Sequence, residues 1–277
     1  FFFKQKTAYE IGVRLVGSEM CNKRQTRGSE LHELTQDKPK AMINIGGEAL
    51  LARTVKQFKK IGINKLAVVA GYKAESINVS GIDIKINKDY ETGNELMSLS
   101  YAEEGFDNDM VITYGDLLFR EHILRDLLEV NGEIVIIVDS ALDNPNMTGS
   151  PDVAYCSQND DRSPFMQNIT LKKLSSKIDG DIEPSGHWIG MMRVRKDGRR
   201  WMETAINELK TSSNFKELTI PDLLNHIIEN GNTVNVHYIN CLLYTSDDAE
   251  EGLGVDLGGR RIIKKNASGG GGGGGGG

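Results

Sequence analysis

Asp116 is the residue whose position in this chain most clearly suggests chemistry. It follows Gly115 at the end of an apolar, β-branched run over residues 111–114. In an open α/β sheet the carboxyl end of a buried strand faces the ligand crevice, and glycine permits a tight exit from the strand. A carboxylate held there suits Mg²⁺, which prefers oxygen ligands and keeps waters for substrate phosphates. Asp116 could equally cap the helix that is predicted to follow it, and this stretch alone favours neither interpretation.

Further chemically suggestive residues stand at the ends of predicted strands or in the loops beside them. Lys40 follows Pro39, which restricts the backbone just before it, so the lysine is either a phosphate contact or a solvated loop residue. Gly71 and Tyr72 end an apolar strand, where they form either a ligand contact or an ordinary turn. Asp139 ends another apolar strand and is either a second carboxylate of the crevice or a turn residue.

The elements that would position these residues alternate between strand-like and helix-like segments joined by short links. This alternation predicts a single α/β domain with a doubly wound, mostly parallel sheet, and we expect residues 169–174 and 186–194 at a mixed edge of it. Strands are predicted at residues 41–45, 65–70, 82–86, 111–114, 133–138, 169–174, 186–194 and 233–239, and helices at 48–61, 73–77, 93–104, 120–130, 201–209 and 218–229.

Bulk properties exclude several classes of protein. A chain of 277 residues suits one large α/β domain, and a formal net charge of -6 argues against non-specific binding of nucleic acid. No apolar run approaches the roughly 20 residues needed to cross a bilayer, so we expect no membrane association. The 3 cysteines match no metal spacing, which makes a reducing cytoplasm the simplest location.

Four short motifs occur in a familiar order and spacing: Pro39–Lys40, Gly46–Gly47, Gly71–Tyr72 and Gly115–Asp116. Over residues 27–240 the chain resembles the sugar-nucleotide-type nucleotidyltransferases, which have a GT-A-like, nucleotide-diphospho-sugar-transferase-like fold. Within them it is similar to the small cytidylyltransferases that act on phosphocholine or on phosphonates. The resemblance implies transfer of a nucleotidyl, and by preference cytidylyl, group from an NTP such as CTP to a phosphorylated or phosphonate small molecule, with release of pyrophosphate.

The resemblance also implies roles for individual residues. Lys40 and Asp116 would be the catalytic residues, with Lys40 pairing with phosphate and Asp116 holding Mg²⁺ as the cofactor. Asp139 would lie near the acceptor. The nucleotide would be contacted by Gly28 of the phosphate-cradling loop and by Lys40, Gly71, Tyr72, Asn94, Ser98 and Gly115; helix capping is the alternative for Asn94.

Two aromatic residues could in principle stack on a cationic acceptor. Tyr155 and Trp188 both have a face suited to an ammonium group. Because Trp188 stands in a predicted strand, we expect it to pack in the core.

Two positions depart from the family pattern. Glu30 stands where the family has its loop arginine, and a carboxylate there would repel a triphosphate. Tyr244 stands where the family has a second metal-binding aspartate. These departures support an alternative function, a non-catalytic nucleotide- or metabolite-binding module of the same fold.

The two ends of the chain differ in character from its middle. Residues 1–26 lack a clear period apart from a strand-like piece at 11–16, and residues 241–277 close in an unbroken run of glycine. Both ends resemble translated sequencing-adapter read-through of the kind found in metagenomic assemblies. We therefore expect non-native or disordered flanks at 1–26 and 241–277 around a nucleotidyltransferase domain at 27–240.

Overall fold

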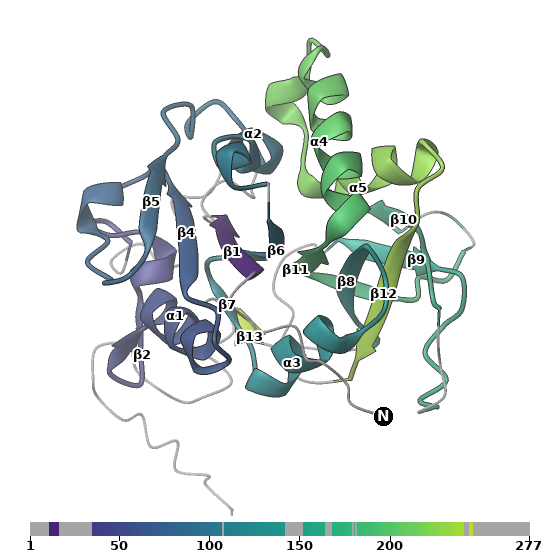
Figure 1. Ribbon diagram of the computed structural model, residues 1–277, viewed down its shortest axis with the longest axis horizontal. Helices are drawn as coiled ribbons and strands as arrows, with labels where there is room; N and C mark the ends of the chain where they lie inside the picture. The colour runs from purple at the N-terminus through teal and green to yellow at the C-terminus, as the bar shows by residue number, and fades with distance from the viewer. Residues whose placement is uncertain are drawn as a thin grey trace, which may run out of the picture.

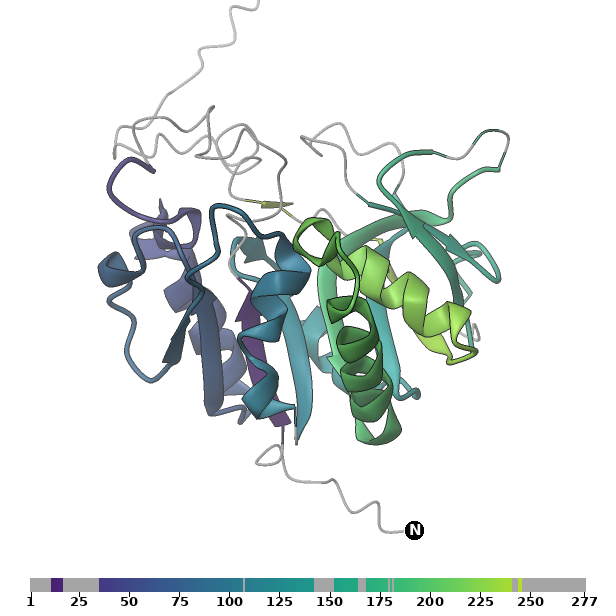
Figure 2. The ribbon, with the colours of Figure 1, turned by 90° about the horizontal axis from the view of Figure 1, so that it is seen from above.

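The computed structural model describes residues 11–16, 35–106, 108–141, 152–163, 168–178, 180, 182–240 and 244–245. They form a mixed sheet with helices packed on both of its faces (Figures 1 and 2). The strands of this sheet are β1 (Ile11–Val16), β4 (Lys65–Ala70), β5 (Asp83–Ile86), β6 (Asp109–Tyr114), β8 (Ile134–Asp139), β9 (Val153–Cys156), β10 (Leu171–Ser175), β11 (Gly186–Val194) and β12 (Val234–Ile239).

The strand directions define the edge on which a site can form. The order across the sheet is β5-β4-β1-β6-β11-β8-β12, and β9 and β10 continue from the start of β11. β11 is antiparallel to both β6 and β8, whereas the other neighbours along this path are parallel. The carboxyl ends of β1, β4, β5, β6, β8 and β12 therefore share one edge, called here the carboxyl edge.

β1 occupies the centre of the parallel half of the sheet. It pairs along its length with β6 on one side and with β4 on the other. The sheet thus includes part of the predicted flank at 1–26 and extends beyond the predicted domain start at residue 27. The foreign origin of that flank stays a prediction.

Two layers of helices follow from the alternation of side chains along the strands. Ile134, Ile136 and Val138 of β8 pack with the helices α2 (Glu95–Ser100), α4 (Lys196–Lys210) and α5 (Ile220–Glu229). Val135 and Ile137 point to the opposite face and pack with α1 (Leu50–Lys60) and α3 (Glu121–Glu129). Burial on both faces explains the nearly continuous apolar character of β4 and β8.

The predicted strand at 41–45 is wrong for its first residues. Lys40–Met42 form a 3₁₀ helix with buried Ala41 and Met42, and only β2 (Asn44–Ile45) is extended. β2 pairs with β3 (Glu48–Ala49) through Gly46 and Gly47, both with positive φ (59° and 87°). A two-residue hairpin of this type needs φ above zero at both positions, which glycine adopts without strain.

Two predicted helices are shorter than expected. The helix predicted at 73–77 is a 3₁₀ helix at Ala74–Ser76, because Lys73 has a left-handed φ of 48°. The helix predicted at 93–104 ends as α2 at Ser100, and a separate 3₁₀ helix follows at Glu103–Gly105. Gly62, with φ of 88°, follows the end of α1, where a left-handed glycine is favoured.

The predicted position of residues 186–194 at a sheet edge is also corrected. β10 does lie at an edge, but β11 lies between β6 and β8. Its apolar side chains supply both cores: Trp188 and Met192 pack on one face and Ile189 and Met191 on the other. Only an interior strand covered on both sides needs this pattern.

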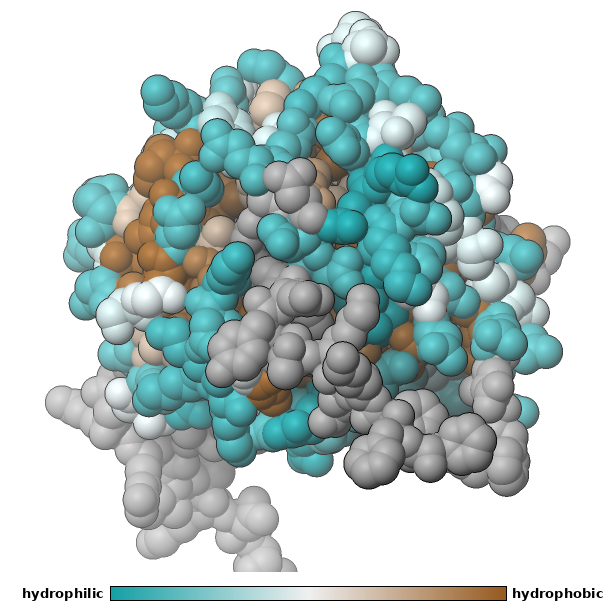
Figure 3. All heavy atoms as spheres, viewed as in Figure 1, coloured by the Kyte–Doolittle hydropathy of each residue, from teal (hydrophilic) through white to brown (hydrophobic). Residues whose placement is uncertain are grey.

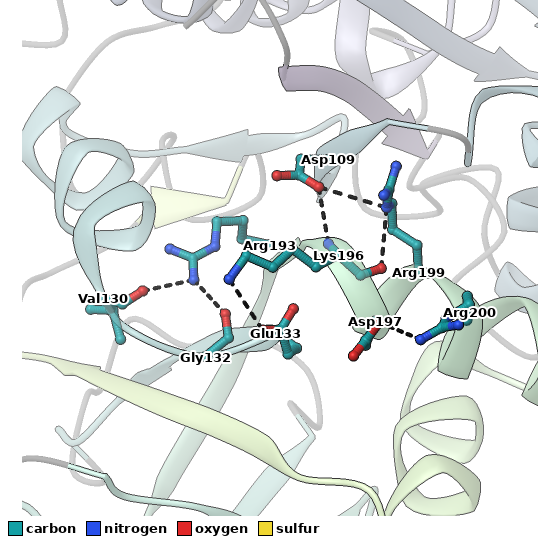
Figure 4. A network of polar contacts seen from close by, with 9 residues as sticks. All are labelled: Asp109, Val130, Gly132, Glu133, Arg193, Lys196, Asp197, Arg199 and Arg200. Atoms are coloured by element: carbon teal, nitrogen blue, oxygen red, sulfur yellow. Dashed lines mark hydrogen bonds and ion pairs between the residues drawn. The ribbon is translucent and has the colours of Figure 1, made fainter. Parts of the chain in front are cut away.

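A polar network lies at the edge of the sheet opposite the carboxyl edge, where β6 and β8 begin (Figure 4). This network supports the fold. The fully buried Arg193 donates from its guanidinium to the carbonyl oxygens of Leu127, Val130 (2.7 Å) and Gly132 (2.9 Å). It thereby satisfies carbonyls at and just after the end of α3, which the helix leaves unpaired. Burial lowers the pKa of Arg193 to about 9. Within the ranges described above, no helix is long and apolar enough to span a bilayer.

Candidate functional site

Asp116 lies in the turn that leaves β6 at the carboxyl edge. Gly115 and Asp116 connect β6 to the short strand β7 (Leu117–Leu118), and α3 begins only at Glu121. The N-cap of α3 is Arg120. Asp116 therefore does not cap that helix, and one of its two alternative interpretations is removed.

A segment from far along the chain lies beside this turn. β13 (Tyr244–Thr245) pairs antiparallel with β7, with Tyr244 opposite Leu118 and Thr245 opposite Leu117. The backbone at position 244 is thus brought next to the strand that directly follows Asp116. This is where the resemblance implies a second metal-binding aspartate, and the chain has tyrosine there.

The Pro-Lys and Gly-Tyr motifs meet at the same edge. Pro39 is extended, with φ -67° and ψ 154°, and Lys40 begins the 3₁₀ helix that follows it. Tyr72 donates its hydroxyl hydrogen to the carbonyl oxygen of Gln36 at 2.7 Å, which ties the two loops together. Gly71 lies so close to Tyr90 that an added Cβ would be 2.3 Å from the Cβ of that tyrosine. Only glycine fits this turn without displacing the neighbouring loop.

The two predicted nucleotide contacts on α2 lie in different surroundings. Asn94 is the N-cap residue of α2, but its side chain donates to the carbonyl oxygen of Glu217 (3.0 Å) and does not cap the helix. Ser98 is buried, where its hydroxyl accepts from the amide of Asn87 (3.1 Å) and donates to the carbonyl oxygen of Asn94 (3.3 Å). Ser98 thus lies beneath the surface and connects α2 to Asn87, the residue that follows β5.

Asp139 ends β8 at the carboxyl edge and is only 1% exposed. One of its carboxylate oxygens accepts from the backbone N–H of Ala141 at 3.0 Å, which is the geometry of a local turn. Burial raises the pKa of this carboxyl. The structure therefore places Asp139 under the surface of this edge, and its contact with an acceptor stays a prediction.

The partly buried Tyr114, the buried Trp188 and nearby carboxylates form a feature that sequence reasoning missed. Tyr114 ends β6, packs its ring against Trp188 with centroids 5.6 Å apart, and donates its hydroxyl hydrogen to Glu95 at 2.6 Å. Burial raises the pKa of Asp152 to about 7, and the negative charges of Glu95 and Asp222 add to the rise. Perturbed carboxyls of this kind gather at functional sites more often than elsewhere.

The reason sequence reasoning missed this cluster is that it is assembled from distant segments. Glu95 opens α2, Tyr114 ends β6, and Asp152 stands just before β9. None of these residues belongs to a local motif, and only the tertiary fold gathers them. The burial of Trp188 confirms the prediction that it packs in the core.

Comparison with known proteins identifies the family. The family model described as a MobA-like NTP transferase domain matches residues 28–179, which is more than half of the chain. The chain belongs to this family. Gly28 and Glu30 fall within the matched range but lie outside the described residues.

Curated relatives of this NTP transferase domain use different nucleotides. The chain is 27% identical over 125 residues to a CTP:phosphoglutamine cytidylyltransferase of Campylobacter jejuni, covering 41% of this chain and 49% of that protein. It is 31% identical over 103 residues to a UTP–glucose-1-phosphate uridylyltransferase of Haloferax volcanii, covering 35% and 42%. It is 27% identical over 104 residues to a choline-phosphate cytidylyltransferase of Streptococcus pneumoniae, covering 36% and 45%. The match thus spans about half the length of these relatives or less.

Solved structures support the fold over most of the chain. A CTP:phosphocholine cytidylyltransferase from Streptococcus pneumoniae superposes with a TM-score of 0.62 at 15% identity, covering 86% of this chain and 94% of that one. An inositol-1-phosphate CTP transferase from T. maritima gives 0.62 at 16% identity, covering 88% and 98%. At this identity the likeness establishes the nucleotide-diphospho-sugar-transferase-like fold.

The carboxylate of Asp116 can be compared with what a metal ion requires of its ligands. Within the described ranges, no three or more His, Cys, Asp or Glu side chains are grouped to hold an ion. A single carboxylate at a strand end fits Mg²⁺, which binds through one or two carboxylates and completes its shell with water and substrate phosphates. The binding of Mg²⁺ by Asp116 stays a prediction.

Proposed function

We propose that this chain transfers a nucleotidyl group from an NTP, with CTP as the donor, to a phosphorylated or phosphonate small molecule. An oxygen of the acceptor's phosphate or phosphonate attacks the α-phosphorus of the NTP. The bond from that phosphorus to the oxygen bridging to the β-phosphate breaks, and pyrophosphate leaves. The acceptor oxygen is already anionic, so the step needs no general base to remove a proton.

The observation that carries the proposal is the meeting of three motif loops at the carboxyl edge of a family fold. The loop before Lys40 is tied to the loop of Tyr72 by the hydrogen bond to Gln36, and Asp116 leaves β6 at the same edge. Ligands of open α/β sheets bind outside the carboxyl ends of the strands. Catalysis at such a site comes mostly from holding the reactants in line and from neutralising charge on the phosphates.

Each of these residues has a proposed role. Lys40 pairs with an oxygen of the triphosphate, and the Gly71–Tyr72 turn contacts the nucleoside. Asp116 would hold Mg²⁺, which when bound neutralises phosphate charge and orients the leaving group. Asp139 lies beneath the acceptor side of the edge. The curated relatives act, by their names, on phosphoglutamine, glucose-1-phosphate and choline phosphate, which all present a phosphate group.

The test is pyrophosphate release by the full chain. CTP, UTP, GTP, ATP and dTTP are each incubated with Mg²⁺ and either phosphocholine or 2-aminoethylphosphonate, and pyrophosphate is followed with a coupled enzyme assay. We expect release that requires both substrates and is fastest with CTP. Fastest release with another NTP would refute the choice of CTP and keep the reaction class; no acceptor-dependent release with any pair would refute nucleotidyl transfer to these acceptors.

Variants assign the activity to the proposed residues. Lys40→Met and Asp116→Asn should each lower kcat/KM by about 10²–10³-fold, the range for losing one charge-stabilising group. Lys38→Met, in the same loop, is the matched control and should leave the rate within a few-fold. Circular dichroism and thermal unfolding show that the variants are folded. Equal losses in all three would contradict the specific role of Lys40.

The second candidate is a binding module without turnover, which is favoured by the tyrosine that β13 brings beside the Asp116 turn. Isothermal titration of the full chain with CTP separates the two functions. Binding of CTP without release of pyrophosphate, for every acceptor tested, would favour the module.

A further inference from the structure

The edge strand β5 has an unusual sequence for an outer strand. Residues 82–86 read Ile-Asp-Ile-Lys-Ile, and the pattern is symmetric about Ile84 apart from the sign of the charge at its two flanks. Among the described residues, β5 pairs only with β4, so its other side is an open sheet edge. An open edge is a template for pairing with another strand.

The backbone of β5 determines which residues could bond outward. The N–H of Asn87 donates to the carbonyl oxygen of Ala70 in β4 at 2.8 Å. Since the backbone groups of alternate residues point to opposite sides of a strand, those of Asp83 and Lys85 also face β4. The N–H and C=O groups of Ile84 and Ile86 then face away from the sheet, where a partner strand would receive them.

We propose that two copies of this chain associate by antiparallel pairing of β5 with β5 of the second copy, about a two-fold axis at Ile84. This register opposes Ile84 to the same residue of the other copy, with both outward backbone groups bonded. It opposes Asp83 to Lys85 on both sides of the axis, and Ile82 to Ile86. Every cross-strand pair is then favourable, because apolar residues face apolar ones and opposite charges face each other.

Charge argues for a second copy in place of an unrelated strand. A lysine on an edge strand usually discourages strand addition. On one face of the strand, the Nζ atom of Lys85 lies 3.4 Å from Oδ2 of Asp83 and 3.2 Å from Oε2 of Glu104 in its own chain. A two-fold partner brings a second Asp83 next to Lys85. The positive charge of Lys85 therefore disfavours pairing with unrelated strands but favours pairing with β5 of a second copy. Such an interface is isologous and closes as a dimer.

The opposite face of β5 supplies apolar surface to the same interface. Ile86 is 48% exposed, and Ile84 and Ile82 are partly exposed. The segment before β5 adds the partly exposed Ile77 and Val79, which pack against the core beneath. The space-filling view shows an apolar patch on the side of the molecule where β5 lies (Figure 3). Pairing would cover part of this patch on both copies.

Charge reversal tests the register by sedimentation equilibrium of the full chain. Lys85→Asp opposes two aspartates and Asp83→Lys opposes two lysines, so each should raise the dimer Kd about tenfold or more. The double variant Asp83→Lys/Lys85→Asp restores opposite charges and should recover the dimer. Lys85→Asp and the double variant both lose the contact with Glu104, so that loss cannot explain a difference between them.

The control is Lys172→Asp, an exposed lysine of the outer strand β10, which should leave the Kd unchanged. A monomer at every concentration would overturn the proposal. So would a dimer whose Kd ignores both single substitutions, or a double variant no tighter than the singles.

Cross-linking provides a readout independent of charge. In this register the Cα atoms of two residues 84 lie about 5.5 Å apart, within reach of a disulfide. Two residues 86 lie about 13 Å apart along the strands, beyond that reach. Under air oxidation, Ile84→Cys should form a reducible dimer above the level of the unmodified chain, and Ile86→Cys should not. Equal cross-linking at both positions, or at residue 86 alone, would overturn the two-fold axis at Ile84.

Discussion

Replacing Asp152 by asparagine should stabilise the fold in a way that depends on pH. The pKa of this carboxyl is raised to about 7 in the folded chain, through burial and the neighbouring charges of Glu95 and Asp222, against an ordinary value of 3.8. Between these values the folded state holds a proton that the unfolded state has released. Stability contributed by this group is therefore fully present at low pH and is lost as pH rises from about 4 through 7.

The size of the effect follows from the shift. Each pKa unit corresponds to about 1.4 kcal/mol, so a shift of roughly three units costs the ionised fold about 4 kcal/mol. Asp152→Asn removes this cost and keeps the shape of the side chain. The variant should thus gain up to that amount over the unmodified chain at pH 8, and much less at pH 4.5.

The assay is urea unfolding of both chains at pH 4.5, 6 and 8, monitored by circular dichroism. Glu203→Gln removes an exposed carboxylate on α4 and is the matched control for the loss of one negative charge. A difference between Asp152→Asn and the unmodified chain that stays constant with pH would refute the reasoning. A variant less stable than the unmodified chain at pH 8 would also refute it.

Two further substitutions test the scaffold. Arg193→Met leaves three carbonyl oxygens at and just after the end of α3 without their donor and should lower the free energy of unfolding by about 3–5 kcal/mol. The exposed Arg200→Met should cost less than about 0.5 kcal/mol. Both losses are measured by urea unfolding, and equal losses would contradict the role of Arg193. Gly190→Ala meets both a φ of 78° and the ring of Tyr114, with a Cβ 2.0 Å from its Cδ2, and should cost about 2–3 kcal/mol. Gly231→Ala, at φ of 80° with open space around it, carries the backbone strain alone and should cost about 1 kcal/mol; the reverse order of the two losses would refute the steric account.

Local sequence predicted the elements whose pattern is decided by short-range periodicity. The strand predicted at 65–70 is β4, and the helix predicted at 48–61 is α1, whose buried face includes Leu51, Val55 and Phe58. Gly62 terminates α1 because a left-handed residue without a Cβ is favoured there. These features depend on neighbours within a few positions along the chain.

Features set by distant contacts could not be predicted in the same way. Residues 186–194 read as a strand, but their place between β6 and β8 depends on which partners cover both faces. The apolar residues 41–43 fit a strand and a 3₁₀ turn equally well, and packing under α1 decides for the turn. The shifted pKa of Asp152 arises from carboxylates on α2 and α5, which no local motif links to it.

The sequence predicted which residues of the site share one edge of the sheet, but not which of them are buried. The motif residues Lys40, Gly71 and Asp116 follow strands or prolines, and their common edge follows from the parallel order of the sheet. The burial of Ser98 and Asp139 beneath that edge depends on side-chain packing, to which a strand-end position gives no guide.

Label transfer from CTP tests the central claim most directly. The full chain is incubated with Mg²⁺, phosphocholine or 2-aminoethylphosphonate, and CTP labelled with ³²P at either the α- or the γ-phosphate, and the products are separated by thin-layer chromatography. Attack at the α-phosphorus predicts that the α-label moves to a new acceptor conjugate and that the γ-label appears in pyrophosphate. Two results would contradict nucleotidyl transfer. One is the γ-label in the acceptor conjugate, and the other is both labels remaining in CTP when the CTP concentration saturates the protein.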